Sequence, residues 1–577
     1  MTTDGLQELL SRHAPILRFD ARELFYPTAV EPYIATSALV VGGTELLPPG
    51  EVTPEHLDHR IGAQSYLRFI SDHDRRSVVR EEARRLAGKL LGPRLGRVGY
   101  FGRILDALFL LSVFLRPTTP RLTTVAAALK ADRHSFHQRR TCYGRVVQVG
   151  DWLVLHYAYF YVMNDWRSSY QGVNDHEADW EQAWIFCDPA DRRPVWVVCS
   201  SHDYLGSDLR RHWDDPECVR IAERPVLFAG GGSHALFFRP GDYISRIEIP
   251  GLRWLLAVQK WFQRTLRIHD TEDDSGLGPA LGVPFVDSAP GDGTEIADWD
   301  IRPLDEGQPW FGDFRGLWGL DTNDPLNGER GPAGPKFNRG GDIRLAWADP
   351  VGFAGLHGTS PPSMADPQAS LAGIEAGLAH LDDEIRQSSR LMALTSRAQG
   401  DAETVAESRR LSRLLRQRTE LRDLRRRVTS DDVEGRGLRE HLRNPAVPIA
   451  PSRGNRWMLA IWATLSVPLA LVALAAPFLL NETSVVVPLL VLVASFAVLE
   501  QLARGRISAA LRLTGLFVAI ALLSGFVGVI TVSRYAFGAA LAAAALLLFV
   551  GNLRELRSFR RRRVLDAEPS SAEPNSV

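Results

Sequence analysis

The chain of 577 residues is poor in cysteine and lysine, and it lacks the short motifs of common nucleotide-binding and hydrolytic sites. No Walker loop, Rossmann fingerprint, GxSxG or HExxH sequence occurs. The four cysteines show no CxxC spacing, which excludes a disulfide scaffold and predicts buried, reduced thiols. A formal charge of −1 argues against a nucleic-acid-binding protein, which needs a basic face. The four lysines among 67 basic residues fit a GC-rich bacterial genome.

Charge is divided unevenly along the chain. The first 24 residues hold seven charged side chains and no apolar core, so we expect no secretory signal peptide. Residues 1–450 carry 55 basic and 62 acidic side chains, whereas residues 451–577 carry 12 arginines against 6 acids. The net charge is therefore −7 in the first region and +6 in the second, which predicts different surroundings for the two.

Four apolar stretches fill the C-terminal region, at 457–480, 484–502, 513–532 and 535–553. Each has the length of about 17–25 residues that a helix needs to cross a bilayer. If all four stretches cross the bilayer, 11 of the 12 arginines lie on one side of the membrane, and only Arg534 lies on the other. The sequence predicts a multi-pass protein of the inner cell membrane with both termini in the cytoplasm.

The predicted spans carry little chemistry. Glu500 is the one ionisable residue inside them, and its spacing to Arg504 predicts an interfacial i,i+4 pair. Transport pathways usually contain buried ionisable residues, so we interpret the region as an anchor. Gly538 and Ala542 have the small-xxx-small spacing of closely packed helices, which makes a homo-oligomer a candidate assembly.

Three regions flank the four predicted spans. Apolar residues recur with helical spacing between residues 367 and 443, which predicts a coiled-coil-like helical hairpin that forms a stalk. A proline-rich stretch at 445–451 predicts a stiff linker into the first span. Residues 554–577 are basic at first and then predicted to be a disordered cytoplasmic tail.

Residues 1–350 are expected to form a separate domain, because 12 of the 14 tryptophans lie between Trp152 and Trp347. Short β-prone runs separated by Gly, Pro, Asn and Asp predict a mainly β fold, a β-sandwich with a helical insertion at about 70–140. An apolar helix is predicted at 103–116 and a basic, tryptophan-containing helix at 252–268. Both have two interpretations, core packing or contact with the bilayer surface.

The densest cluster of ionisable residues is HEADWE at 176–181. If this segment is a strand, period 2 places Asp179 and Glu181 on one face, opposite Trp180, and His176 enters from the preceding turn. Two carboxylates and an imidazole can hold a divalent cation, with Ca²⁺ or Mg²⁺ favoured and Mn²⁺ suited where histidine joins. The alternative is a set of structural polar residues whose hydrogen bonds are satisfied within the fold.

Four ordered segments resemble the vacuolar protein sorting-associated protein 62 family. They are HAPILRF at 13–19 with ELFYP at 23–27 and VEPY at 30–33, HEADWE at 176–181, GSHA at 232–235 with PGDY at 240–243, and FRGLWG at 314–319 with GPAGP at 331–335. Ala178 stands where that family has glycine, and Leu317 where it has a basic residue. The insertion and the C-terminal third lie outside the resemblance, which implies no defined activity.

A more distant resemblance is to the necrosis- and ethylene-inducing peptide-like proteins, whose GHRHDWE motif matches His176, Asp179 and Glu181 in spacing. Those proteins are β-sandwiches that bind a divalent cation through this motif and recognise sphingolipid headgroups. The resemblance implies that these three residues are metal ligands. A further acidic ligand of that family has Asp165 or Asp175 as its candidate here.

Three functions are expected. The first is a membrane-anchored cytosolic domain that binds a polar or phosphorylated lipid headgroup through a divalent cation. The second is a metal-dependent hydrolase at the membrane, with Glu177, Glu181 or a histidine as base. The third is a structural or membrane-remodelling protein that oligomerises through its stalk and spans. The residues expected around the cavity, besides the three metal ligands, are Asp165, Asp175, Glu177, His202 and His234.

Overall fold

The computed structural model describes most of the N-terminal part and selected parts of the C-terminal third. The described residues are 3–57, 61–78, 123–138, 140–165, 175–201, 205–248, 282–320, 331–357, 359–364, 367–395, 446–448, and residues within 410–425, 458–475 and 486–553. The helices predicted at 103–116 and 252–268, His202 and the tail at 554–577 lie outside them.

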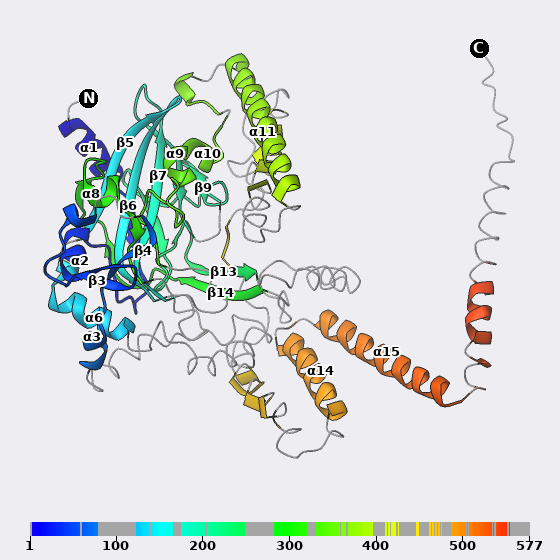
Figure 1. The fold of residues 1–577 in the computed structure, drawn as a ribbon. Coiled ribbons are helices and arrows are strands. Elements are labelled where there is room, and N and C mark those ends of the chain that lie inside the picture. Colours follow the sequence, from blue (N-terminus) through cyan, green and yellow to red (C-terminus); the bar gives the residue numbers. More distant parts are fainter. Residues whose placement is uncertain are drawn as a thin grey trace, which may run out of the picture.

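A six-stranded sheet forms the centre of the N-terminal part, in the order β16-β5-β6-β7-β8-β9 (Figure 1). Its strands are β5 (Thr141–Val149), β6 (Trp152–Asn164), β7 (His176–Cys187), β8 (Pro194–Cys199), β9 (Arg210–His212) and β16 (Asp300–Pro303). Neighbours are antiparallel except for β16, which pairs with β5 in parallel. The long strands β6 and β7 are buried along almost their whole length, so both faces of the sheet are covered.

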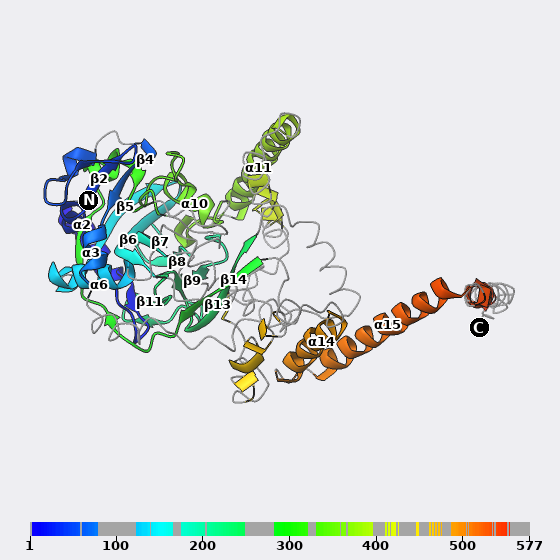
Figure 2. The ribbon, with the colours of Figure 1, turned by 60° about the horizontal axis from the view of Figure 1, so that its bottom comes forward.

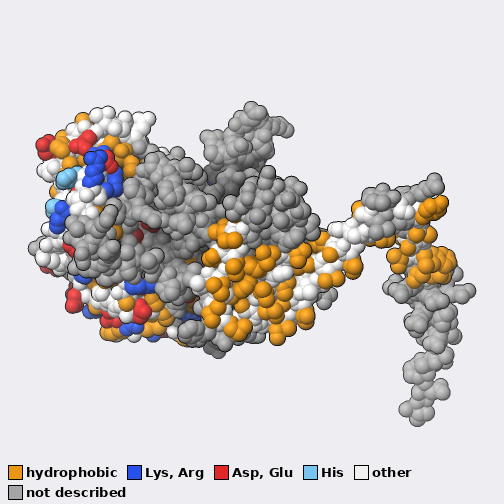
Figure 3. Space-filling model, turned by 90° about the horizontal axis from the view of Figure 1, so that it is seen from below, with side chains coloured by type: hydrophobic (Ala, Val, Ile, Leu, Met, Phe, Trp, Pro, Cys, Tyr) orange, Lys and Arg blue, Asp and Glu red, His pale blue; other side chains and the backbone are white. Residues whose placement is uncertain are grey.

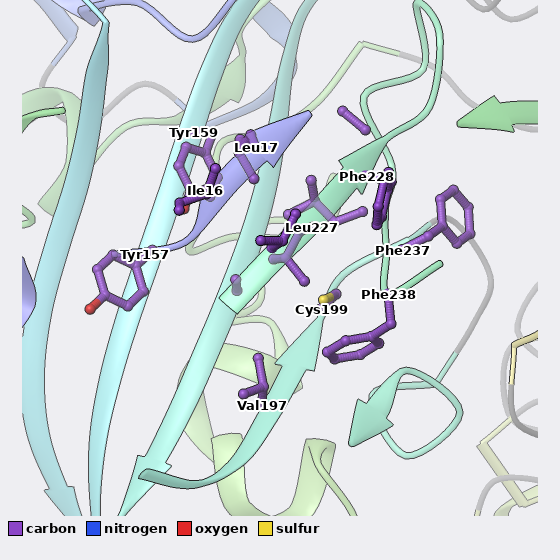
Figure 4. Packing of buried hydrophobic residues seen from close by; sticks show 14 of the residues in the cluster. Ile16, Leu17, Tyr157, Tyr159, Val197, Cys199, Leu227, Phe228, Phe237 and Phe238 are labelled. Atoms are coloured by element: carbon purple, nitrogen blue, oxygen red, sulfur yellow. The ribbon is translucent and has the colours of Figure 1, made fainter. Parts of the chain in front are cut away.

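A second sheet lies against one face. It contains β1 (Ile16–Arg18), β10 (Arg220–Ile221), β11 (Arg224–Ala229), β12 (Leu236–Phe237) and β15 (Glu295–Ile296), with β1 and β11 parallel. Leu17 and Leu227 pack there against Tyr157, Tyr159 and Val197 of the central sheet (Figure 4). This cluster also contains all four cysteines, which are buried and unpaired as the sequence predicts.

The other face of the central sheet is covered by an aromatic core. Trp180 packs edge-on against Trp318 and at a tilt against Phe160, with ring centroids 5.4 and 5.0 Å apart. This side carries the sheet of β2 (Ala38–Val41), β3 (Thr44–Leu47), β4 (Ile61–Arg68) and β17 (Arg315–Leu317). Its short helices are α2 (Val30–Thr36), α3 (Asp72–Arg76), α6 (Thr123–Arg133), α8 (Pro309–Gly312), α9 (Leu345–Ala348) and α10 (Pro350–Phe353), with 3₁₀ turns at Pro54–Leu57, Phe136–Gln138 and Pro362–Met364. Helix α1 (Thr3–His13) lies on the opposite face, where Leu9 and Leu10 join the cluster beneath the second sheet. The tryptophan-rich composition is therefore explained by core packing.

A pair of antiparallel strands and a pair of helices extend from this β-rich part. The strands are β13 (Gly241–Glu248) and β14 (Gly282–Ala289). Helix α11 (Pro367–Thr395) packs against described residues of 410–425, with Ile374 and Leu378 in the same apolar cluster as Leu421. Salt bridges join Glu375 to Arg425, Asp382 to Arg418 and Glu384 to Arg410, so the two segments run antiparallel. This arrangement agrees with a hairpin, while coiled-coil geometry stays a prediction.

The C-terminal helices differ from the rest in having exposed apolar side chains. Helix α14 (Val486–Ala503) lies beside the start of α15 (Ile507–Val532), as Figures 1 and 2 show. Within the described residues, one helix, Ile507–Gly528, is long and apolar enough to cross a membrane, and only 11% of it is buried. Apolar side chains accordingly gather on the surface of this region (Figure 3). The described residues do not show the other three predicted spans as membrane-crossing helices, and multi-pass topology stays a prediction.

Glu500 makes a contact besides its predicted pair with Arg504, which the structure does not test. Its side chain is fully buried and accepts a hydrogen bond from Trp462 Nε1 at 2.6 Å. The Trp462 ring also packs edge-on against Phe496, with centroids 5.2 Å apart. Arg504 lies outside the described residues. The described contact of Glu500 therefore joins the first apolar stretch to α14, which helical spacing within one span could not reveal.

Candidate functional site

The alternation of β7 places two predicted carboxylates on one face. Asp179 lies opposite Tyr161 of β6, and Glu181 lies opposite Tyr159. The following residues of the same face, Ala183 among them, enter the core between the two large sheets. Asp179 and Glu181 therefore share one face of β7, as the sequence predicts. They lie near the N-terminal end of the strand, where polar side chains replace the apolar core.

Ala178 interrupts the alternation just before these carboxylates. Its φ of +59° lies in the left-handed region that glycine adopts more readily than alanine. Glu177 consequently packs elsewhere and accepts hydrogen bonds from the backbone N–H groups of Phe69 and Ile70, at 2.9 and 3.0 Å. Burial raises the pKa of the Glu177 carboxyl even against those two hydrogen bonds. The structure therefore assigns Glu177 to joining β4 and β7, apart from the predicted cavity.

His234 is the fully buried centre of a charged group. Its Nδ1 donates to Asp179 Oδ2 at 2.9 Å, and its Nε2 lies 3.8 Å from Glu23 Oε1. The imidazole stacks on Tyr161, with centroids 3.8 Å apart and an interplanar angle of 9°. Burial alone would lower the pKa of His234, but the carboxylates of Asp179 and Glu23 outweigh it and raise the pKa to about 9. His234 is therefore an imidazolium at neutral pH.

Glu23 was not singled out from the sequence, although it begins the ELFYP segment at 23–27. Its Oε1 accepts hydrogen bonds from the N–H groups of Leu24 and Phe25, at 2.7 and 2.9 Å. Its Oε2 accepts from Gly232 N–H at 2.9 Å. A carboxylate that bonds three backbone amides is fixed in position, and only the fold brings it to His234, 211 residues further along the chain.

Asp165 joins this group through the glycine-rich turn before His234. Its N–H donates to Gly232 O at 3.0 Å, and a Cβ on Gly232 would lie 2.5 Å from Asp165 Oδ1. Gly232 also has a φ of +77°, so glycine meets both a conformational and a spatial requirement here. Asp175 lies half-buried directly before β7. We call Glu23, Asp165, Asp179, Glu181 and His234 the acidic site.

The hydroxyl group of Tyr161 lies near the carboxylates of the acidic site, and a second buried hydroxyl group belongs to Ser233, the residue before His234. Tyr161 is fully buried, and burial together with the carboxylates of Glu181, Asp179 and Glu23 raises its pKa well above the usual value. Ser233 is also fully buried, and within the described part of the chain neither hydroxyl makes a hydrogen bond. Carboxylate and hydroxyl oxygens are donors that hard divalent cations prefer.

The predicted metal ligands are nevertheless engaged with protein groups. Asp179 accepts from Trp180 N–H as well as His234, Glu181 accepts from Ser200 Oγ, and His176 Nδ1 donates to Ala178 O at 2.7 Å. Among the described residues, no three His, Cys, Asp or Glu side chains form a group that could hold a metal ion by themselves. A cation here would need further donors.

Comparison with known proteins adds little. No family model matches the chain, and no curated protein matches it. One solved structure, necrosis and ethylene inducing protein 2 from the causal agent of cocoa's witches' broom disease, is similar at 19% identity with a TM-score of 0.14. The match covers 17% of this chain and 43% of that chain. So loose a superposition carries no argument, and the family resemblances stay expectations.

Proposed function

We propose that this chain is a membrane-associated binding protein whose acidic site takes a polar or phosphorylated lipid headgroup together with a divalent cation. The observation that carries the proposal is the burial of Asp179 and Glu23 against the imidazole of His234, with two further buried carboxylates, those of Asp165 and Glu181, in the acidic site. Buried ionisable groups are costly to maintain unless they are paired, and they concentrate at functional sites. The acidic site is also where the core between the two sheets becomes polar.

The cation follows from the charge of the site. Asp179 and Glu181 are its least buried carboxylates, with 8% and 6% of their surface exposed, so a ligand meets them first. An anionic headgroup is repelled by carboxylates unless a cation lies between them. Asp179 and Glu181 would contribute carboxylate oxygens to that cation, which neutralises them, and headgroup oxygens would supply the missing donors. Ligation of one cation by both the protein and the headgroup would explain why the protein alone provides too few ligands for it.

Membrane association gives the headgroup a source. The exposed apolar surface of Ile507–Gly528 suits a bilayer. We extend this to the full prediction, a β-sandwich on the cytoplasmic side of the inner membrane, anchored by four spans.

Binding is favoured over hydrolysis by the state of the candidate bases. Glu177 is held by two backbone amides away from the acidic site, and Glu181 accepts from Ser200. His234 is already protonated and has both ring nitrogens directed at carboxylates. A general base needs a free lone pair at the pH of the reaction. We therefore assign no catalytic step.

The test is thermal unfolding of the full chain in detergent, followed by tryptophan fluorescence. Ca²⁺, Mg²⁺ or Mn²⁺ should raise the midpoint, and glycerol 3-phosphate should raise it further only when the cation is present. Saturation at 100 times the dissociation constant stabilises a protein by about 2.7 kcal/mol. Glu181→Gln should abolish both shifts. Glu295→Gln, which alters an exposed ion pair with Arg18, should retain them. Equal midpoints with cation and with chelator would refute the proposal.

A further inference from the structure

The segment 446–448, which precedes the first apolar stretch, lies against the β-rich part. Ala446 N–H donates to Asp208 O at 3.1 Å, and Ala446 O accepts from Arg211 Nη2 at 3.2 Å. The Ala446 side chain is 6% exposed and belongs to the core cluster between the two large sheets. Its neighbour Val447 is 40% exposed. One residue of the linker is thus bound through both its backbone groups and its side chain.

Arg211 of β9 is held in place for this contact by the β-rich part itself. Its guanidinium is fully buried, pairs with Glu217 at 3.0 Å and donates to the carbonyl oxygens of Asp208 and Arg210. Glu217 also pairs with Arg239 at 3.0 Å. The donor that meets the linker is therefore positioned by contacts that do not involve the linker, which lowers the entropy cost of docking.

A glycine completes the contact on the other side. Gly241 begins β13 with a φ of +150°, and a Cβ at this position would lie 2.4 Å from Pro448 Cβ. Only glycine lets the proline ring approach so closely. Gly241 lies seven residues after His234, and Phe237 between them stacks on Tyr243, which follows Gly241, with ring centroids 3.8 Å apart. The same short stretch therefore carries a residue of the acidic site and a residue that touches the linker.

We propose that Asp208, Arg211 and Gly241 form a docking site for the chain's own segment 446–448, and that this contact holds the acidic site near the first apolar helix. We call it the linker clamp. The contact itself is independent of the function proposed above. Its consequence for a lipid headgroup rests on that function.

Chain length shows what the clamp changes. The helix pair also touches the β-rich part, because Gln417 donates to Gly352 O at 3.2 Å. From Arg425 to Met458 there are 33 residues, which reach at most about 120 Å when extended. From Pro448 to Met458 there are 10 residues, which reach at most about 36 Å. Docking of the linker thus shortens the maximum reach from the β-rich part to Met458 about threefold, which keeps the acidic site close to a bilayer surface.

Hydrogen exchange of the full chain in detergent tests the clamp without any ligand. Residues 445–448 contain two prolines, so their only backbone amides are those of Ala446 and Val447. The clamp predicts that the Ala446 amide of the wild-type chain exchanges at least about tenfold slower than an unstructured amide. Exchange at the unstructured rate would overturn the proposal, and this measurement needs no variant.

A matched pair of variants gives a second readout. Ala446→Glu places a charge in the core cluster, whereas Val447→Glu places the same charge in solvent. The flanking Arg443 and Arg453 are trypsin sites. Cleavage at them should be about tenfold faster in Ala446→Glu and unchanged in Val447→Glu, since opening of the segment sets the rate. Equal rates in both variants would contradict the clamp, whether or not the acidic site binds a headgroup. Near-ultraviolet circular dichroism checks that the β-rich part stays folded.

Discussion

The β-rich part and the C-terminal helices differ in which side chains they bury and which they expose. Around His234 the protein buries charges, and each described charge there is met by another charge or by backbone amides. Along Ile507–Gly528 it exposes apolar side chains, and only 11% of that helix is buried in the protein. Buried charge and exposed apolar surface are both unfavourable in a soluble protein. Each of the two features therefore suits contact with a partner other than water, such as a bound ligand or a bilayer.

The largest effect is expected from breaking the buried charges. Asp179→Asn removes the negative partner of a fully buried imidazolium, and breaking a buried ion pair from one side costs about 3–5 kcal/mol. Urea unfolding followed by tryptophan fluorescence measures the loss. Asp300→Asn, which alters an exposed pair with Arg302, is the control and should change stability by no more than about 1 kcal/mol. Similar values for the two variants would show that the His234 pair is not a buried interaction.

The pH dependence of stability probes the same residues. The pKa of His234 in the folded protein, about 9, is above its ordinary value of 6.5, so its contribution to stability is complete below pH 6.5 and is lost as the pH rises to 9. The unfolding free energy should therefore fall by roughly 3 kcal/mol across this window. His234→Gln should flatten the fall, and His56→Gln, at an exposed position, should leave it unchanged. A fall that persists in His234→Gln belongs to another group.

A smaller change in stability is expected when two alanines of β7 are replaced by glycine. Ala183→Gly loses a buried methyl group worth about 0.8 kcal/mol and adds the cost of glycine in a strand, about 0.5–1 kcal/mol. Ala178→Gly loses the same methyl group but relieves a left-handed alanine, worth about 1–2 kcal/mol, so its net effect should be near zero. Chemical denaturation of both variants measures the difference. If Ala178→Gly is the more destabilising, the left-handed conformation is wrong.

The smallest effect is expected in the helical region. Glu500→Leu removes the acceptor of the Trp462 N–H group, whereas Glu500→Gln retains a carbonyl oxygen there. Hydrogen bonds between membrane helices are worth about 0.6–1.7 kcal/mol. The thermal midpoint of helix melting in detergent, followed by circular dichroism, should be lower for Glu500→Leu than for Glu500→Gln. Equal midpoints would mean that the bond does not stabilise the helices.

The sequence predicts local features of the β-rich part well. Period 2 correctly places Asp179 and Glu181 on one face of β7, and Trp180 in the core on the other. It does not show where Glu177 points, because the left-handed Ala178 shifts the alternation before the carboxylates, and single-sequence patterns do not show φ. Glu23 and the clamp residue Arg211 were missed because their partners are distant in sequence. Helical spacing predicts Arg504 as a partner of Glu500, which stays a prediction, and it could not show the described contact with Trp462.

Direct cation binding tests the central claim. Equilibrium dialysis of the full chain in detergent against Ca²⁺ or Mn²⁺, with glycerol 3-phosphate present, followed by elemental analysis, counts the bound ions. The account predicts one ion per chain that is lost in Glu181→Gln and retained in Glu295→Gln. No bound ion in the wild-type chain, or an ion retained by Glu181→Gln, would contradict it.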